Sequence, residues 1–230
     1  IPKRDWSSDV CSSDLRAAGG DAAARGIWRA AASLELFHTF ALIHDDVIDG
    51  ATERRGAPTT GEVFGGGARG RAVAILVGDL AADLAAYLLR TSGFPADRLA
   101  AATERYDAMV LALAAGQFLD LDDRNRATLD ASLRVARLKS SAYSVEGPLA
   151  IGAALAGAAP DVGSSLAAYG RSLGEAFQLR DDLHDGDAAP GVTAADVDAR
   201  IDAACAALGP IAGEVARDLR DVATSLRMGI

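Results

Sequence analysis

Residues 27–49 read IWRAAASLELFHTFALIHDDVID. Side chains of one helix face recur in this stretch at spacings of three and four, at Ile27, Ala31, Leu34, His38 and Ala41. The spacing predicts one long helix over residues 21–49. Gly50 follows its last turn directly, in the position where helices often end on a glycine. The predicted helix therefore closes on a group of three aspartates.

The rest of the chain also favours helices. It has 230 residues, of which 51 are alanine, the strongest helix former, and 50% are hydrophobic. Glycine and proline gather at apparent breaks and no strand-like alternation persists, so we expect an all-α fold. A loop is expected over 50–70 and a polar turn over 123–127, with Thr128 as the next N-cap. The further helices are expected at 71–90, 96–122, 129–145, 147–158, 160–185, 194–208 and 210–227.

The charge balance excludes some classes of partner. The chain has 23 basic and 32 acidic residues, a net charge of −9 and no basic run, which excludes a nucleic-acid binder. No transmembrane segment is expected, because the apolar stretch 72–89 is interrupted by Asp79 and Asp83. Only Cys11 and Cys205 are present, so a disulfide framework is excluded and the cytoplasm is the expected compartment.

The first residues differ from everything that follows. Residues 5–15 read DWSSDVCSSDL, without helical periodicity. A common short-read sequencing adapter translates in one reading frame to this string. We therefore interpret residues 1–15 as adapter-derived and exclude them from the fold. Residues 16–230 are expected to form a single, incomplete all-helical domain.

Two predicted helices end on the same aspartate pattern, DDxxD. The first consists of Asp45, Asp46 and Asp49, and the second of Asp181, Asp182 and Asp185. Residues four apart lie on one helix face, so each pattern can direct two carboxylates at one point. Each acidic side chain in the last turn of a helix costs ~0.3–1 kcal/mol, because the helix dipole is negative there.

A divalent cation would stabilise such clusters. Magnesium binds through oxygen ligands, commonly one or two carboxylates together with substrate phosphates. Two identical patterns at equivalent helix ends therefore favour a magnesium–diphosphate site. The alternative is a pair of solvated acidic helix ends without a bound ion.

Cations suited to a diphosphate accompany the aspartates. Arg54 and Arg55 follow the first pattern closely, and guanidinium groups bind phosphate in bidentate fashion. Lys139, in the segment RLKSSAY, is the only lysine outside residues 1–15. In a chain that otherwise uses arginine, this lysine suggests a phosphate contact, although a surface lysine is the simpler alternative.

These segments together resemble the polyprenyl synthetase family, the trans-isoprenyl diphosphate synthases. LFHTFALIHDDVIDGATERRGAPT resembles the first aspartate-rich region of the family, and GEAFQLRDDLHD the second. GDL at 78–80, GQFLDL at 116–121 and RLKSSAY at 137–143 occur in the order of the family. The resemblance covers residues 20–187.

The resemblance implies a fold, an activity and partners. The fold would be an isoprenoid-synthase-type helical bundle with a central cavity, assembled as a homodimer. The activity would be the magnesium-dependent condensation of isopentenyl diphosphate with dimethylallyl, geranyl or farnesyl diphosphate. Phe40 and Ala41, just before the first aspartates, would floor the cavity and favour a C20 product, with C15 as the second choice.

The resemblance also implies roles for individual residues. Magnesium (Mg²⁺) would be held by Asp45, Asp46, Asp49 and Asp181, supported by Asp182 and Asp185. The allylic diphosphate would contact Arg54, Lys139 and Gln178, while Arg55 would contact isopentenyl diphosphate. Ser140 stands where the family often has threonine, and Gln117 is a further expected substrate contact.

Some features depart from the family pattern and leave alternatives open. The N-terminal Gly-Lys-x-x-Arg-Pro segment is absent, and no lysine follows Asp185. His184 stands inside the second pattern, where we expect an interior histidine. The alternatives are a non-catalytic or inactive partner subunit of such a synthase, a class I terpene cyclase, and a metal phosphohydrolase built on His44 and Asp45.

Overall fold

The computed structural model describes residues 25–122, 127–211 and 213–227. The adapter-like segment 1–15 lies outside these ranges, as does most of the predicted turn 123–127. Over the described residues the chain is helical apart from one short hairpin, which confirms the all-α prediction. The chain divides into two compact units, one spanning Arg25–Gly93 and the other beginning at Phe94. The predicted assignment of 16–230 to one domain, with a central cavity, stays a prediction.

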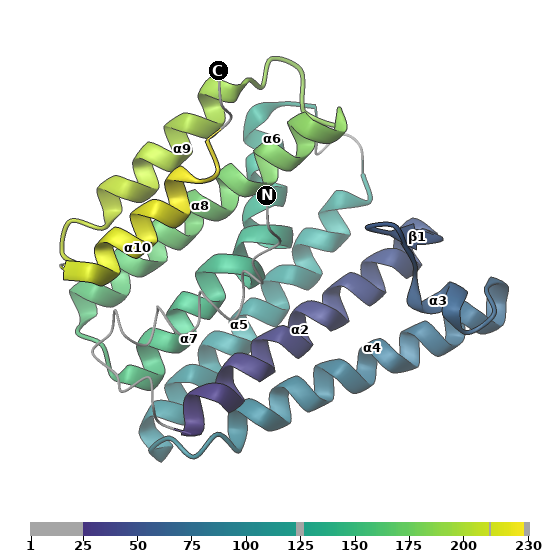
Figure 1. Ribbon diagram of the computed structural model, residues 1–230, viewed down its shortest axis with the longest axis horizontal. Coiled ribbons are helices and arrows are strands. Elements are labelled where there is room, and N and C mark those ends of the chain that lie inside the picture. The colour runs from purple at the N-terminus through teal and green to yellow at the C-terminus, as the bar shows by residue number, and fades with distance from the viewer. Residues whose placement is uncertain (1–24, 123–126, 212, 228–230) are drawn as a thin grey trace. The chain divides into compact units, whose positions relative to one another are not determined.

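The first unit is built on two long helices, α2 (Arg25–Asp49) and α4 (Gly67–Arg90), which run side by side in Figure 1. Between them lie β1 (Glu53–Arg54), β2 (Ala57–Pro58) and α3 (Thr60–Val63). The prediction of a plain loop over 50–70 was therefore wrong. The hairpin turns at Arg55 and Gly56, both with positive φ, as two-residue hairpin turns require.

Small residues on α4 allow it to approach α2 closely. Its buried positions are Gly70, Ala74, Gly78, Ala81, Ala85 and Leu89. A Cβ on Gly78 would lie 2.3 Å from the ring of His44, whose Nε2 is 3.2 Å from the carbonyl oxygen of Ile75. The glycine of the GDL segment therefore makes room for the residue that directly precedes Asp45.

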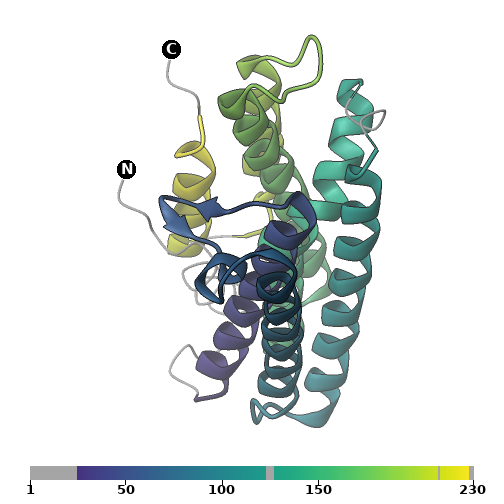
Figure 2. The same cartoon turned by 90° about the vertical axis from the view of Figure 1, so that its right-hand side faces the viewer.

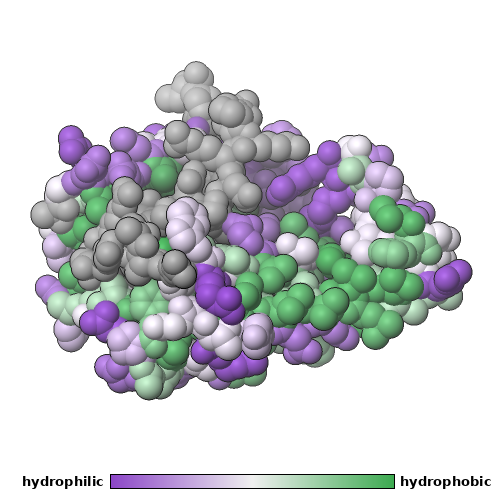
Figure 3. Space-filling view, turned by 60° about the horizontal axis from the view of Figure 1, so that its bottom comes forward, coloured by the Kyte–Doolittle hydropathy of each residue, from purple (hydrophilic) through white to green (hydrophobic). Residues whose placement is uncertain are grey.

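The large apolar residues of α4 lie on its opposite, exposed face. Leu76, Leu80, Leu84 and Tyr87 are 42–68% exposed, and green surface of this kind is visible in Figure 3, seen from below Figure 1. By length and composition, α4 could cross a membrane. Its most apolar 18-residue stretch has a mean hydropathy of 1.9, and 28% of that stretch is buried. An exposed apolar face on a single helix is also typical of a surface that packs against another protein.

The second unit is entirely helical over its described residues. Its core surrounds α8, whose Tyr169 hydroxyl donates to the carbonyl oxygen of Leu219, 2.7 Å away. Figures 1 and 2 show α8 and α9 side by side, and α8 also packs against η2. The elements are α5 (Ala96–Asp120), α6 (Leu129–Val135), η2 (Ala136–Glu146), α7 (Gly147–Ala156), α8 (Pro160–Asp185), α9 (Ala194–Ala207) and α10 (Gly213–Thr224).

The segment 129–156 differs from the prediction in one respect. Thr128 is confirmed as the N-cap, since its hydroxyl accepts from the backbone N–H of Ala131 at 3.2 Å. The predicted α-helix, however, changes to a π-helix at Ala136 and continues without a break into α7. π-Helical turns are rare and occur frequently at functional sites. Lys139 and Ser140 both lie in this π-helix.

We expect Gly78→Ala to destabilise the first unit by about 1–3 kcal/mol, because the added Cβ overlaps the His44 ring in a packed contact. Chemical denaturation followed by circular dichroism measures the change. Gly163→Ala is the control, because a Cβ at that helical position meets nothing within 4 Å. This variant should be neutral or slightly stabilising, and an equal loss in both variants would contradict the packing described here.

Candidate active site

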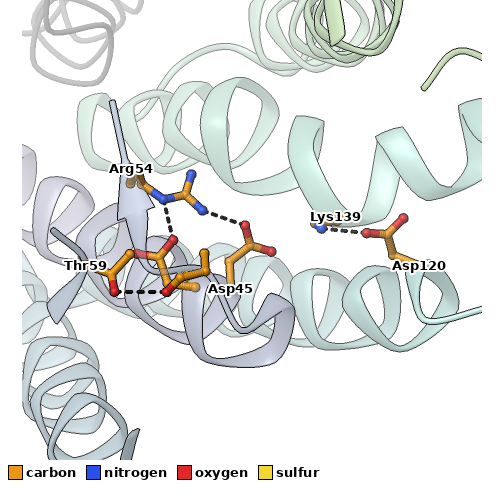
Figure 4. Close-up of polar contacts among 7 residues, drawn as sticks. Asp45, Arg54, Thr59, Asp120 and Lys139 are labelled. Carbon is orange, nitrogen blue, oxygen red and sulfur yellow. Dashed lines mark hydrogen bonds and ion pairs between the residues drawn. The ribbon is translucent and has the colours of Figure 1, made fainter. Parts of the chain in front are cut away.

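The first aspartate cluster lies at the end of α2 and is closed by an arginine from the hairpin. Arg54 Nε donates to Asp46 Oδ1 at 2.6 Å, and a terminal nitrogen of Arg54 donates to Asp45 Oδ2 at 2.9 Å (Figure 4). Asp46 is buried and Asp45 is partly buried, whereas Asp49 is exposed. One guanidinium thus pairs with two neighbouring carboxylates and compensates one of their two negative charges, at a helix end that disfavours negative charge.

The environment of Arg54 favours its charged form. Burial lowers its pKa, but the hydrogen bond and the negative charge of Asp46, followed by those of Asp45, outweigh the burial and raise the pKa above its ordinary value. Arg54 is therefore a permanent cation beside the first cluster. It is suited to a phosphate oxygen as well as to the carboxylates.

Thr59 fixes the hairpin against the helix end. Its hydroxyl donates to the carbonyl oxygen of Ala51 at 3.0 Å (Figure 4). Its N–H donates to the carbonyl oxygen of Thr52 at 3.1 Å. The side chain is buried, and the sequence analysis did not single it out. Arg55, in contrast, is exposed at the tip of the turn. The hairpin therefore directs one arginine at the aspartates and presents the other at its tip.

Phe40 and Ala41 lie one turn before the first cluster. Phe40 contacts the rings of Phe37 and His44, with centroids 5.3 and 4.8 Å away, and Ala41 is buried. Ala41, four residues before Asp45, lies on the same face of α2 as Asp45, whereas Phe40 lies on the face of His44. Their role as a cavity floor stays a prediction.

The second cluster lies in the other unit, at the end of α8. A pocket in this unit is lined by Asp120 of α5, by Lys139 and Ser140 of η2, and by Gln178 and Asp182 of α8. Lys139 Nζ lies 2.6 Å from Asp120 Oδ2 (Figure 4). Ser140 donates to the Gln178 side-chain oxygen, and Gln178 Nε2 donates to Asp182 Oδ1 at 2.7 Å. The structure thus brings together four residues that the sequence selected.

Asp120 is the site residue that the sequence analysis missed. Its carboxylate is 9% exposed and holds the only lysine of the described chain. The signal was its place in GQFLDL, but a single aspartate at a helix end has no spacing that identifies it. Gln117, one turn earlier on α5, is half-buried and its substrate contact stays a prediction.

Glycine again allows the backbones to meet at the pocket. A Cβ on Gly116 of α5 would lie 2.2 Å from the backbone nitrogen of Lys139, and one on Gly174 of α8 would lie 2.3 Å from the Ser141 hydroxyl oxygen. The π-helix therefore lies directly against α5 and α8. This close approach places Lys139 beside Asp120 and Ser140 beside Gln178.

Asp181 and Asp185, the other two aspartates of the second pattern, are not among the pocket-lining residues. Both are exposed, whereas the pocket residue Asp182 is partly buried. The prediction that His184 is an interior histidine was wrong, because its side chain is 82% exposed and its Nδ1 lies 2.9 Å from Asp185 Oδ1. The position falls on the solvent side of the last turn of α8.

The donor set fits magnesium, although no ready-made cluster is present. Among the described residues, no group of three His, Cys, Asp or Glu side chains is placed to hold a metal. Magnesium commonly takes only one or two carboxylates and completes its shell with water and phosphate oxygens. Asp45 and Asp46, which Arg54 brings together by contacting both, offer two such carboxylates. The expectation that both aspartate patterns share one ion cluster stays a prediction.

The geometry defines a class: a chain that is mainly helical over its described residues, with one aspartate pattern paired to Arg54 and the other reaching a pocket that Lys139 also lines. The polyprenyl synthetase family model matches residues 10–197, and the chain belongs to this family. A geranylgeranyl diphosphate synthase of Mycobacterium tuberculosis (strain ATCC 25618 / H37Rv) is 39% identical over 165 residues, covering 70% of this chain and 45% of the relative. A (2E,6E)-farnesyl diphosphate synthase of Mycobacterium bovis is 37% identical over 155 residues, covering 66% and 41%.

Solved structures show the same fold. The geranylgeranyl pyrophosphate synthase of Corynebacterium glutamicum, complexed with isoprenyl diphosphate and magnesium, has a TM-score of 0.85 at 26% identity and covers 96% of this chain and 85% of its own. The enzyme of the archaeon Geoglobus acetivorans has a TM-score of 0.88 at 22% identity, which supports the fold alone. The chain spans about half the length of the curated relatives that it matches.

We expect Arg54→Met to destabilise the first unit by about 1–3 kcal/mol, because two neighbouring carboxylates lose their cation. Arg55→Met is the matched control, since its side chain is exposed at the turn, and should change stability by less than about 0.5 kcal/mol. Denaturant titrations measure both changes. Equal effects of the two substitutions would contradict the role given to Arg54.

Proposed function

We propose that this chain carries the active site of a magnesium-dependent prenyltransferase, which condenses isopentenyl diphosphate with an allylic diphosphate. The observation that carries this proposal is that each aspartate pattern has a cation suited to phosphate close by. Arg54 pairs with Asp45 and Asp46 of the first pattern, and Lys139, itself held by Asp120 of α5, lines the same pocket as Asp182 of the second. The relatives support it, since they are named as farnesyl and geranylgeranyl diphosphate synthases.

The residues that would hold magnesium are Asp45, Asp46 and Asp49 in one unit, and Asp181, Asp182 and Asp185 in the other. When bound, magnesium supplies positive charge that stabilises the departing diphosphate. The similar Corynebacterium glutamicum structure contains magnesium and isoprenyl diphosphate, which supports this choice of ion.

The side chains of the chain itself bind and orient the substrates. Arg54 and Lys139 bind the oxygens of the allylic diphosphate as cations, and Gln178 and Ser140 complete these contacts with neutral donors. Fixed positive charge beside the leaving group favours the state in which its bond to carbon breaks. The double bond of isopentenyl diphosphate, whose diphosphate Arg55 would contact, then attacks the allylic carbon and a proton is lost. Gln117 is a further expected substrate contact. No nucleophilic side chain is required.

Product length is the finer part of the proposal. Phe40 stands five positions before Asp45 and Ala41 four, so one bulky and one small residue lead to the site. We propose a C20 product, with C15 as the second choice. The relatives include farnesyl, geranylgeranyl and geranylfarnesyl synthases, which bracket these lengths.

Incubation with magnesium, labelled isopentenyl diphosphate and each of dimethylallyl, geranyl and farnesyl diphosphate tests the function directly. We expect elongated prenyl diphosphates, separated by chain length. Asp45→Asn should reduce turnover by at least about 100-fold, since metal-ligand losses commonly cost several kcal/mol of transition-state stabilisation.

The control is Asp218→Asn, an exposed aspartate of α10, which should retain full activity. Release of diphosphate without elongation would contradict the proposal in favour of a cyclase. A folded wild-type chain that turns over no substrate would instead support an inactive partner subunit.

We further propose that the chain forms a homodimer in the cytoplasm through the exposed face of α4. Leu76, Leu80 and Leu84 recur every four residues on this face and continue to Tyr87. An apolar stripe of this length on an exposed helix is typical of a protein–protein interface. A second copy of the chain would present the same stripe and bury both.

Analytical ultracentrifugation tests the dimer. We expect the wild type to sediment at twice the 23.5 kDa mass of the chain, and Leu80→Glu to sediment as a monomer, because a buried unpaired charge opposes association. Leu80→Met is the control and should remain dimeric. A monomeric wild type, or a dimeric Leu80→Glu variant, would contradict this interface.

A further inference from the structure

A buried carboxylate in the second unit has no role in the function proposed above. Glu175 of α8 is 2% exposed, yet it lies between two arginines from neighbouring elements. Arg137 of η2 donates from Nε to its Oε1, and Arg200 of α9 lies with Nε 3.4 Å from its Oε2. Burial of an unpaired carboxylate is strongly unfavourable, so this residue depends on both partners.

Glu175 shares a helix face with the pocket residues. Positions 175, 178 and 182 are spaced by three and four, so Glu175, Gln178 and Asp182 form one row along α8. Gln178 accepts from Ser140 and donates to Asp182, as described above. The row therefore carries a buried anchor at one end and the pocket at the other.

The partners of this row also belong to one short segment. Arg137 and Ser140 flank Lys139 in the π-helix. Each of them contacts α8, while Lys139 itself is held by Asp120 of α5. Because the backbones touch at Gly174 and Ser141, a small rotation of α8 would move the Gln178 amide away from Ser140.

We propose that Glu175 is a positioning residue for the diphosphate pocket. Through Arg137 and Arg200 it fixes the rotation of α8 against η2, and so holds the Gln178 amide beside Ser140 in the pocket that Lys139 also lines. The inference rests on the proposed function of this pocket. It differs from a purely structural role because its effect must pass through Gln178.

A double-mutant cycle separates these two roles. The ligand is inorganic pyrophosphate with magnesium, and its dissociation constant is measured by calorimetry for the wild type, Glu175→Gln, Gln178→Ala and the double variant. We expect Glu175→Gln to weaken binding about tenfold. The double variant should bind about as weakly as Gln178→Ala alone, since the anchor has nothing left to position.

The control removes another ion pair between the same two helices. Glu146 at the end of η2 lies 3.1 Å from Arg171 of α8, away from the pocket. Glu146→Gln should leave binding within about twofold of the wild type, because this pair anchors no pocket residue. If Glu175→Gln does not fold, Arg137→Met replaces it. Arg137 is 48% exposed, and without it the buried carboxylate still has its second partner, Arg200.

Each outcome has a clear meaning. Additive effects of the two substitutions, or a lower melting temperature with unchanged affinity, would show a structural role only and overturn the proposal. Failure of the wild type to bind pyrophosphate would contradict the proposed function itself and this inference with it. Normal wild-type binding with an unaffected Glu175→Gln variant would overturn the inference alone.

Discussion

Every functional feature of this chain depends on carboxylates that must be neutralised. Asp45 and Asp46 gather at a helix end whose dipole opposes them, and Arg54 returns from the hairpin to pair with both. In the other unit, Asp120 is paired by Lys139 and Glu175 by Arg137. Two of these cations, Arg54 and Lys139, are also those proposed to bind a diphosphate, so the same side chains would serve both the fold and the proposed site.

Close contacts at glycines position the elements that carry these charged side chains. Gly78 admits His44 beside the first aspartates, Gly116 admits the backbone of Lys139, and Gly174 admits Ser141. Each glycine lies where a Cβ would overlap a neighbour by a large margin. The contacts at Gly116 and Gly174 hold the π-helix between α5 and α8. Lys139 and Ser140, which lie at or next to these contacts, line the pocket.

Much of this arrangement could be predicted from the sequence, but only where residues of one kind recur or mark the ends of a helix. Pro160 and the loop that begins at Gly186 predicted α8 with its observed bounds, and the repeated aspartate pattern identified both helix ends. The sequence did not distinguish the π-helix from an α-helix, because the change to i→i+5 hydrogen bonds leaves no clear mark on the residue pattern of so short a segment. Asp120 and Glu175 were missed because their partners come from distant segments, and the Arg55–Gly56 turn lacks the usual Asn-Gly signal.

The central proposal is that the carboxylates of both aspartate patterns bind diphosphate through magnesium ions. Anomalous diffraction from crystals grown with inorganic pyrophosphate and manganese, in place of magnesium, tests it most directly. The proposal predicts manganese peaks bound by Asp45 and by Asp181, each in contact with pyrophosphate oxygens, and Lys139 turned from Asp120 to the pyrophosphate oxygens. Ions confined to one aspartate cluster, or a pyrophosphate bound away from both, would contradict it.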